Sequence, residues 1–249
     1  MILLVRHGTT TTTGKELPGR APGLHLAESG QRQAAQVAER IVAATRPRPP
    51  APDGTTSADG NGADGNGSRD GAAHPGPGST PAADPASPQG SGVAAVYASP
   101  LERTRETAAP IAAALGLDVQ VDKGLIELDV GDWTGVDLAE AAKRPEWKVI
   151  QSYPSGFTFP GGESFLAMQS RMVATLDKLR RRHPGQTVVA VSHADPIRAL
   201  VAHAMGTHLD LFQRIVVSPC SLTAVALGHR GPIVLTVNAT GDPGPLVPS

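Results

Sequence analysis

The chain has little of three things that mark particular classes of protein: cysteine, aromatic side chains and an excess of charge of one sign. Cys220 is the only cysteine in 249 residues. This excludes an intramolecular disulfide and a zinc site built from thiolates, and it fits a reducing compartment. The 22 basic and 23 acidic residues nearly cancel, which argues against a polybasic binder of nucleic acid or membranes. With only eight aromatic residues, the core is predicted to consist mainly of Ala, Val, Leu and Ile.

Apolar runs long enough to span a membrane are also missing from the sequence. The apolar stretch Met1–Val5 ends at Arg6 and is too short for the hydrophobic region of a signal peptide. We therefore expect a soluble cytoplasmic protein with no membrane partner and no nucleic-acid partner. Its oligomeric state is open, with a homodimer as one alternative.

The segment 47–92 lacks every large apolar side chain. Its 46 residues include nine Pro and ten Gly but no Val, Ile, Leu, Met, Phe, Tyr or Trp. No apolar surface is available whose burial would offset the entropy of ordering this segment, so we predict a disordered insertion. The tail 241–249 has a similar composition and is expected to be flexible. The sequence thus predicts a single domain over 1–240 that the insertion interrupts.

Short apolar runs alternate with helical patterns along this domain. The predicted strands span residues 1–5, 94–98, 119–121, 187–192, 222–227 and 233–238. The predicted helices span residues 28–44, 101–115, 164–182 and 196–205. This alternation predicts an α/β fold in which helices cover both faces of a mostly parallel sheet, that is, a three-layer α/β/α sandwich.

Charged and titratable residues follow the ends of several predicted strands, where open α/β sheets bind their ligands. The triplet 6–8, Arg-His-Gly, comes directly after the first strand, and Gly8 is predicted to let the backbone turn close to a ligand. Residues 99–104 follow the second strand and Ser192-His193 follow a later one. An acidic stretch, 127–132, lies in a turn-rich segment. We expect these residues to form one ligand site.

Through these motifs the chain resembles the histidine phosphatase superfamily, also called the phosphoglycerate mutase-like family. An Arg-His-Gly triplet after an N-terminal strand is the defining motif of that family. The resemblance covers the chain apart from the insertion and the tail, and within the family it is similar to an actinobacterial-type branch described as phosphomutases. The further matching motifs, in the family's order, are Leu26–Ala34, Ser99–Thr104, Glu127 before Gly131–Gly135, Gly161–Ser164 and Ser192-His193.

The resemblance implies a phosphoglycerate mutase-like fold and a role for each matching residue. His7 would be the nucleophile that forms a phosphohistidine, and Glu127 would be the general acid and base. His193 would stabilise the transferring phosphoryl group as a hydrogen-bonding cation. Arg6 and Arg103 would bind the phosphate, because planar guanidinium donors suit its oxygens, and their charges would keep His7 neutral. No metal or other cofactor is implied, since these groups supply the positive charge.

Two positions differ from the family's pattern around the phosphate. Many members carry an Asn a few residues beyond the triplet that contacts the phosphate, whereas this chain has the threonine run 9–13. Either Thr13 or a neighbouring hydroxyl takes over that contact, or the contact is lost. Arg20 stands where the family often has a substrate-facing residue, so we expect it to touch the rim of the phosphate site.

Two acidic assignments have competitors. Asp129 and Asp132 compete with Glu127 for the role of acid, and the family's spacing favours Glu127. Asp195 follows Ser192-His193 where glycine is usual, and it is predicted either as the N-cap of the next helix or as a substrate contact. Because Asp directly before Pro is a common helix start, the cap is favoured.

Two activities fit the predicted site. A phosphatase would release phosphate from a small phosphorylated metabolite, whereas a mutase would return the phosphoryl group to another hydroxyl. The sequence lacks the extra basic insertions that enclose a phosphoglycerate in mutases, which favours the phosphatase. A non-catalytic phospholigand-binding protein fits less well, because all the expected catalytic residues are present. A metal-dependent hydrolase on His7, His193 and Asp195 fits less well too, because the local ligand spacing is missing.

Substrate selectivity is predicted to depend on the segment 137–162. Four of the eight aromatic residues of the chain fall there: Trp147, Tyr153, Phe157 and Phe159. They form either a lid or side wall over the phosphate pocket or a small satellite core.

Overall fold

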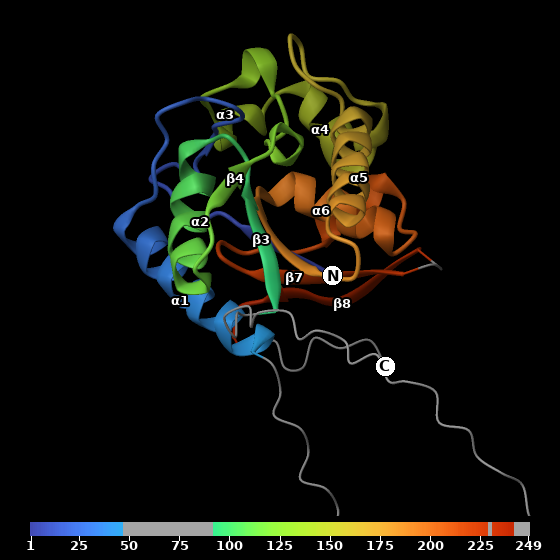
Figure 1. Ribbon diagram of the computed structural model, residues 1–249. Coiled ribbons are helices and arrows are strands. Elements are labelled where there is room, and N and C mark those ends of the chain that lie inside the picture. Colours follow the sequence, from blue (N-terminus) through green and yellow to red (C-terminus); the bar gives the residue numbers. More distant parts are fainter. Residues whose placement is uncertain (47–91, 229–230, 242–249) are drawn as a thin grey trace, which may run out of the picture. The chain divides into compact units, whose positions relative to one another are not determined.

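The computed structural model describes residues 1–46, 92–228 and 231–241, to which every structural statement below refers (Figure 1). The predicted disordered insertion 47–92 lies outside the described residues except for Gly92. The predicted flexible tail lies outside them except for Gly241. Both therefore stay predictions. Among the described helices, none is long and apolar enough to cross a membrane.

The central sheet has six strands in the order β4-β3-β6-β1-β7-β8. The first four run parallel, and their bounds are β4 (Val119–Val121), β3 (Val93–Ala98), β6 (Thr187–Ser192) and β1 (Ile2–Arg6). The remaining two pair antiparallel, β7 (Leu222–Gly228) with β1 and β8 (Gly231–Ala239) with β7. A separate small sheet pairs β2 (Glu16–Leu17) with β5 (Val136–Asp137). The mostly parallel sheet is confirmed.

Helices cover both faces of this sheet (Figure 1). One face carries α1 (Glu28–Thr45) and α2 (Glu102–Leu115), and the other carries α5 (Phe165–Arg182) and α6 (Ala194–Ala204). Because side chains of a strand alternate between its faces, Leu3 and Val5 pack with α1 and α2, whereas Ile2 and Leu4 pack with α5 and α6. The three-layer α/β/α sandwich is confirmed.

The ends of the helices show which of the predicted capping residues cap a helix in the structure. Ser164 caps α5, since its hydroxyl accepts the Ala167 N–H at 3.1 Å, and Gly116 ends α2 in the left-handed conformation with φ of 68°. The predicted cap at Asp195 is wrong. The helix begins two residues earlier than predicted, with His193 at its N-cap, so Asp195 is already the second helical residue.

The segment 137–162 contributes α3 (Leu138–Ala141), α4 (Pro145–Ser152) and a short 3-10 turn. Phe157 and Phe159 are buried in a third core that is separate from the two cores on the sheet, so the satellite core is confirmed for them. Trp147 packs half-buried against this core, whereas Tyr153 is 56% exposed. Further 3-10 turns cover Lys123–Leu125, Gly131–Trp133 and Leu209–Arg214.

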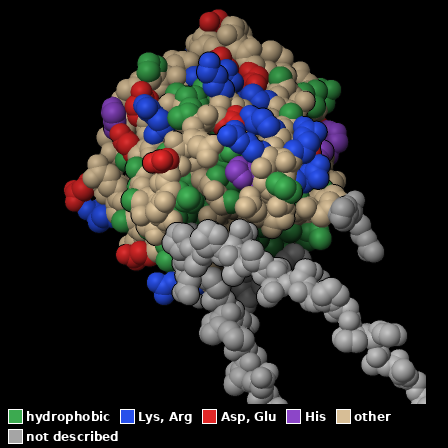
Figure 2. All heavy atoms as spheres, in the orientation of Figure 1, with side chains coloured by type: hydrophobic (Ala, Val, Ile, Leu, Met, Phe, Trp, Pro, Cys, Tyr) green, Lys and Arg blue, Asp and Glu red, His purple; other side chains and the backbone are tan. Residues whose placement is uncertain are grey.

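Basic side chains gather on the face that α5 presents in Figure 2. Arg180 and Arg181 form ion pairs with Asp177 one turn earlier, both at 2.8 Å, and Lys178 pairs with Asp122. These pairs neutralise part of the basic cluster at the end of α5. The two pairs with Asp177 contribute little to stability because both of their partners are exposed.

Candidate functional site

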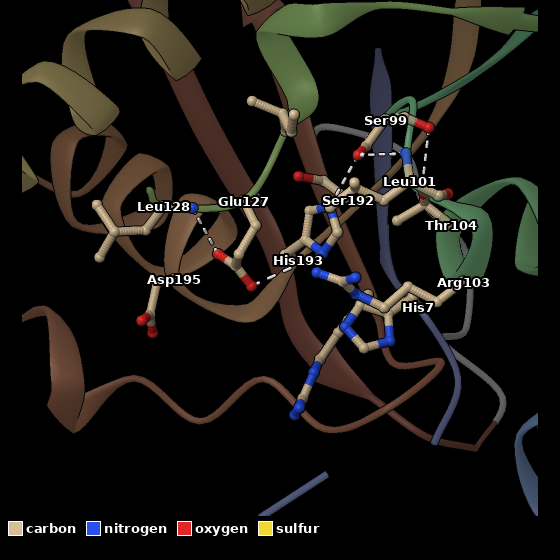
Figure 3. A network of polar contacts seen from close by, with 12 residues as sticks. His7, Ser99, Leu101, Arg103, Thr104, Glu127, Leu128, Ser192, His193 and Asp195 are labelled. Atoms are coloured by element: carbon tan, nitrogen blue, oxygen red, sulfur yellow. Dashed lines mark hydrogen bonds and ion pairs between the residues drawn. The ribbon is translucent and has the colours of Figure 1, made fainter. Parts of the chain in front are cut away.

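The carboxyl ends of three parallel strands bring the predicted site residues together. The His7 N–H donates to the Ser192 carbonyl at 3.0 Å, and the Ser99 N–H donates to the Val191 carbonyl at 3.0 Å. These bonds extend the pairing of β1, β6 and β3 by one residue each. As a result His7, Ser99 and His193 meet at one edge of the sheet, as Figure 3 shows.

His7 has one ring nitrogen committed and one free. Its Nδ1 lies 2.7 Å from the Gly8 carbonyl, and since a carbonyl only accepts, Nδ1 carries the proton and Nε2 keeps a lone pair. Burial, reinforced by the charges of Arg103 and Arg6, lowers the pKa of His7 to about 3. The ring is therefore neutral at physiological pH, as a nucleophile requires.

Gly8 serves a packing role beside this ring. A Cβ at Gly8 would lie 2.6 Å from the carbonyl oxygen of Gly30, so only glycine allows the loop after β1 to lie this close to α1. The Gly8 N–H donates to the Thr107 hydroxyl of α2 at 3.0 Å. The structure thus explains this glycine by contact with helices, where the sequence suggested close approach to a ligand.

Two arginines of the site have donors without a hydrogen-bond partner among the described residues. Arg103 is fully buried, and its Nη2 donates to the Gly19 carbonyl at 2.9 Å, but Nε and Nη1 have no hydrogen-bond partner among the described residues. Arg6 donates from Nη1 to the Val217 carbonyl at 2.7 Å, and its Nε likewise has none there. Burial lowers the pKa of both guanidiniums. Since a buried unpaired donor costs about 1–3 kcal/mol, this arrangement is suited to receiving an anion.

Glu127 presents one carboxylate oxygen to the site. Its Oε1 accepts the Leu128 N–H at 2.9 Å, and its Oε2 lies 3.7 Å from Nδ1 of His193 (Figure 3). Burial, followed by the nearby Asp195 carboxylate, raises the pKa of Glu127 to about 7, although Arg103 opposes the shift. The group can therefore both give and take a proton near neutral pH.

The two competing acids lie in less suitable places. Asp129 accepts the Gly131 N–H at 3.0 Å and pairs with Arg20 at 3.2 Å, so both its oxygens are engaged. Asp132 is exposed to solvent. The geometry favours Glu127 as the general acid, in agreement with the spacing of the family's motifs.

His193 is fully buried and, like His7, carries its ring proton on Nδ1. Its Nε2 lies 2.8 Å from the Ser99 hydroxyl, which itself accepts the Leu101 N–H at 3.4 Å. The hydroxyl proton is thus free to bond Nε2, which leaves the ring proton on Nδ1, facing Glu127. Burial and the Arg103 charge hold the pKa of His193 well below its usual range. The lowered pKa favours a neutral ring that donates from Nδ1, whereas the sequence predicted a cation.

Arg20 is bonded to the loop that carries Glu127. Its Nε donates to the Glu127 carbonyl at 2.8 Å, while Nη1 and Nη2 bond Asp129 and Glu163 at 3.2 and 2.9 Å. These bonds give Arg20 a positioning role, and its predicted phosphate contact stays a prediction. The sequence motif 161–164 contained Glu163 but gave no reason to join it to Arg20.

A second arginine also bonds the loop that carries Glu127. Arg171 on α5 bonds Glu163 at 2.9 and 3.1 Å and the carbonyls of Gly124 and Ile126, each at 2.8 Å. Sequence reasoning missed Arg171, because a lone arginine on a helix resembles any surface charge.

Thr13 has a partner within its own turn. Its hydroxyl accepts the Thr10 N–H at 2.9 Å and lies 2.9 Å from the Thr10 hydroxyl. Its predicted phosphate contact stays a prediction.

Comparison with known proteins assigns this fold and site to a class. A profile of the histidine phosphatase superfamily, branch 1, matches residues 2–48 and 86–240. The chain therefore belongs to the histidine phosphatase superfamily. This confirms the resemblance that the sequence motifs indicated.

Individual relatives are similar over part of the chain. The Bifunctional protein Rv2228c of Mycobacterium tuberculosis is 39% identical over 152 residues, which are 60% of this chain and 42% of that protein. Phosphoserine phosphatase 1 of Hydrogenobacter thermophilus is 34% identical over 155 residues, 58% of this chain and 70% of that protein. The matched region thus spans less than half of the length of the mycobacterial relative. That a relative is mycobacterial agrees with the resemblance to an actinobacterial-type branch.

A solved structure shares the fold. The phosphoserine phosphatase of Entamoeba histolytica, a mutant solved with phosphoserine, superimposes with a TM-score of 0.71 at 20% identity and covers 97% of this chain and 98% of that one. At this identity the likeness concerns the fold, which is the three-layer sandwich described above.

Proposed function

We propose that the protein is a metal-independent phosphomonoesterase that acts on a small phosphorylated metabolite through a phosphohistidine intermediate. The observation that carries this proposal is the state of His7: it is neutral, its Nε2 lone pair is free, and it lies near two arginines that have buried donors without partners among the described residues. Arg6 and Arg103 bind the non-bridging phosphate oxygens, and His193 adds a hydrogen bond from Nδ1.

The first half-reaction transfers the phosphoryl group to the enzyme. Nε2 of His7 attacks phosphorus, a P–N bond forms, and the P–O bond to the leaving alcohol breaks. Glu127, protonated on Oε2, gives its proton to the departing oxygen and becomes a carboxylate. The arginines stabilise the charge on the phosphoryl oxygens throughout.

The second half-reaction releases phosphate. The Glu127 carboxylate takes a proton from water, whose oxygen attacks phosphorus as the P–N bond breaks. Inorganic phosphate leaves, and His7 and Glu127 return to their starting protonation states. A pKa near 7 suits this double use, because the group is then neither permanently charged nor permanently protonated.

The relatives support hydrolysis of a small substrate. The proteins from H. thermophilus and E. histolytica are named phosphoserine phosphatases, and the latter was solved with phosphoserine. A mutase would share the first half-reaction and differ only in the acceptor. A cytoplasmic location is part of this proposal, because the single cysteine fits a reducing compartment.

The test is a rapid-quench experiment with a radiolabelled phosphomonoester. The wild type should acquire an acid-labile, base-stable label and release one phosphate per turnover. His7→Ala should lose both, while His203→Ala, an exposed histidine on α6, should keep both. EDTA should leave the rate unchanged. Full activity in His7→Ala would refute the mechanism, and isomerised product without free phosphate would identify a mutase.

A further inference from the structure

The carboxylate of Glu163 lies between two arginines. Its Oε2 accepts from Nη2 of Arg20 and from Nη2 of Arg171, both at 2.9 Å, and its Oε1 accepts from Nε of Arg171 at 3.1 Å. Only 15% of the Glu163 side chain is exposed. Three charge-assisted hydrogen bonds to a mostly buried carboxylate fix the orientation of both guanidiniums.

Both guanidiniums direct their other donors at the backbone next to Glu127. Nε of Arg20 donates to the Glu127 carbonyl at 2.8 Å. Nη1 of Arg171 donates to the carbonyls of Gly124 and Ile126, each at 2.8 Å. Side chains from two distant segments, the loop after β2 and helix α5, therefore hold the backbone on the N-terminal side of Glu127.

The backbone of Glu163 holds the C-terminal side of the same loop. Its N–H donates to the Asp129 carbonyl at 2.8 Å, and the Asp129 carboxylate accepts from Nη1 of Arg20 at 3.2 Å. Oε2 of Glu127 lies 3.7 Å from Nδ1 of His193. Because the backbone is fixed on both sides, the positions that this oxygen can take are limited.

The charges of this cluster cancel. The two guanidiniums face two carboxylates, Glu163 and Asp129, in ion pairs of 2.9–3.2 Å. The charge of Arg171 also helps to lower the pKa of His193, so it acts on the site. Without Glu163 the cations would exceed the carboxylates by one charge. An uncompensated cation there would favour the charged form of Glu127 and lower its pKa.

We propose that Glu163 is a positioning residue of the reaction: its carboxylate orients the two arginines toward the backbone that carries Glu127 and cancels the charge that they bring. The inference rests on the proposed function, in which Glu127 is the general acid. The oriented arginines hold the acid in place for proton transfer, and the cancelled charge keeps its pKa near 7.

The other charged and titratable groups that act on Glu127 come from different elements. They are Arg6 of β1, Arg103 of α2, Asp195 of α6 and the ring of His193 at the N-cap of α6. Glu163→Gln leaves all of them in place. A change in the pKa of Glu127 in this variant therefore reports the arginine–carboxylate cluster.

The test compares the pH dependence of kcat/KM in Glu163→Gln and in the wild type. With phosphoserine, an alkyl ester whose leaving group needs a proton, we expect kcat/KM at pH 7 to fall about 10- to 100-fold. With 4-nitrophenyl phosphate the fall should stay below about threefold. The alkaline limb for phosphoserine should move to lower pH by about 0.5–1 unit. Ionisation of the substrate is common to both proteins.

Two further variants separate charge from reach. Glu163→Asp keeps the charge on a shorter side chain, so the limb should stay in place while kcat/KM for phosphoserine falls. Arg20→Met leaves the carboxylates in excess, so the limb should move to higher pH, opposite to Glu163→Gln. Glu140→Gln removes an exposed carboxylate of α3 that pairs with Lys143 at 2.6 Å. It is the matched control and should change neither substrate.

The outcomes separate the two proposals. Equal losses on both substrates with an unmoved limb in Glu163→Gln, while His7 still takes up label, would overturn the role of Glu163 and leave the phosphatase standing. Should circular dichroism show that Glu163→Gln is unfolded, the limbs of the other two variants decide. A limb that stays in place in Arg20→Met, or moves in Glu163→Asp, would then overturn the role. Absence of label on His7 in the wild type would overturn both proposals.

Discussion

The hydroxyl of Ser99 lies 2.8 Å from Nε2 of His193, and this contact decides which ring nitrogen carries the proton. With Leu101 N–H already donating to the hydroxyl oxygen, its proton points to Nε2 and the ring proton stays on Nδ1. A residue at the end of β3 thereby sets the direction of a donor at the end of β6. The tautomer of His7 is set differently, by the carbonyl of the neighbouring Gly8, which accepts from Nδ1.

Replacing Ser99 should impair turnover while leaving the fold intact. Ser99→Ala removes the donor to Nε2, so His193 can adopt the tautomer whose Nδ1 lone pair faces the phosphoryl group. We expect kcat to fall about 10- to 100-fold, with little change in KM. Stopped-flow phosphate release measures the loss, and circular dichroism checks the fold. Unchanged kcat would mean that Ser99 does not set the tautomer.

The pH profile should report Glu127. Its raised pKa of about 7 keeps it protonated below neutrality, and the acid form disappears above pH 7. For an alkyl phosphate, kcat/KM should therefore fall about tenfold per pH unit on the alkaline side. For 4-nitrophenyl phosphate, whose leaving phenolate needs little protonation, the fall should be much smaller. Equal falls on both substrates would point to another acid.

Asp195 should shift the pH dependence of kcat/KM. Its carboxylate is one cause of the raised pKa of Glu127, so Asp195→Asn should lower this pKa and move the alkaline limb of kcat/KM to lower pH. Asp177→Asn on α5 removes a carboxylate outside the site and serves as the control. A limb that stays in place in Asp195→Asn would show that burial alone raises the pKa.

Arg103 should be needed for phosphate binding and for the stabilisation that bound phosphate gives the protein. Arg103→Lys loses the planar fork and should lower kcat/KM about 100- to 1000-fold. Inorganic phosphate should raise the melting temperature of the wild type but not that of Arg103→Met, because a ligand stabilises only the form it binds. Equal stabilisation of both proteins would place the phosphate elsewhere.

Glu127 should also destabilise the protein at alkaline pH. Its folded pKa of about 7 exceeds the unfolded value of 4.5, so stability due to this group is full below pH 4.5 and is lost as pH rises through 7. Glu127→Gln, neutral at every pH, should raise the free energy of unfolding at pH 8 by roughly 2–3 kcal/mol. The gain should be clearly smaller at pH 5. A gain independent of pH would come from packing.

Much of the fold could be predicted from the sequence because strands and helices have characteristic local sequence patterns. The ten predicted elements correspond to strands and helices of the structure, since apolar runs, Ser164 and Gly116 act over a few residues. The Asp195 cap failed for the same reason: the Asp-Pro signal is local, whereas α6 begins where β6 ends at Ser192. Tertiary position outweighed the capping preference.

The sequence by itself determined the residue types of the site, since Arg6, His7 and His193 stand at the ends of strands that must run parallel. Only the tertiary structure decided their chemical states. Protonation depends on burial and on charges brought from distant segments, which is why His193 is neutral and Glu127 titrates near 7. The same holds for Arg20, whose partner Glu163 lies 143 residues away along the chain. Spacing in a sequence carries no record of such contacts, because they exist only once the chain has folded.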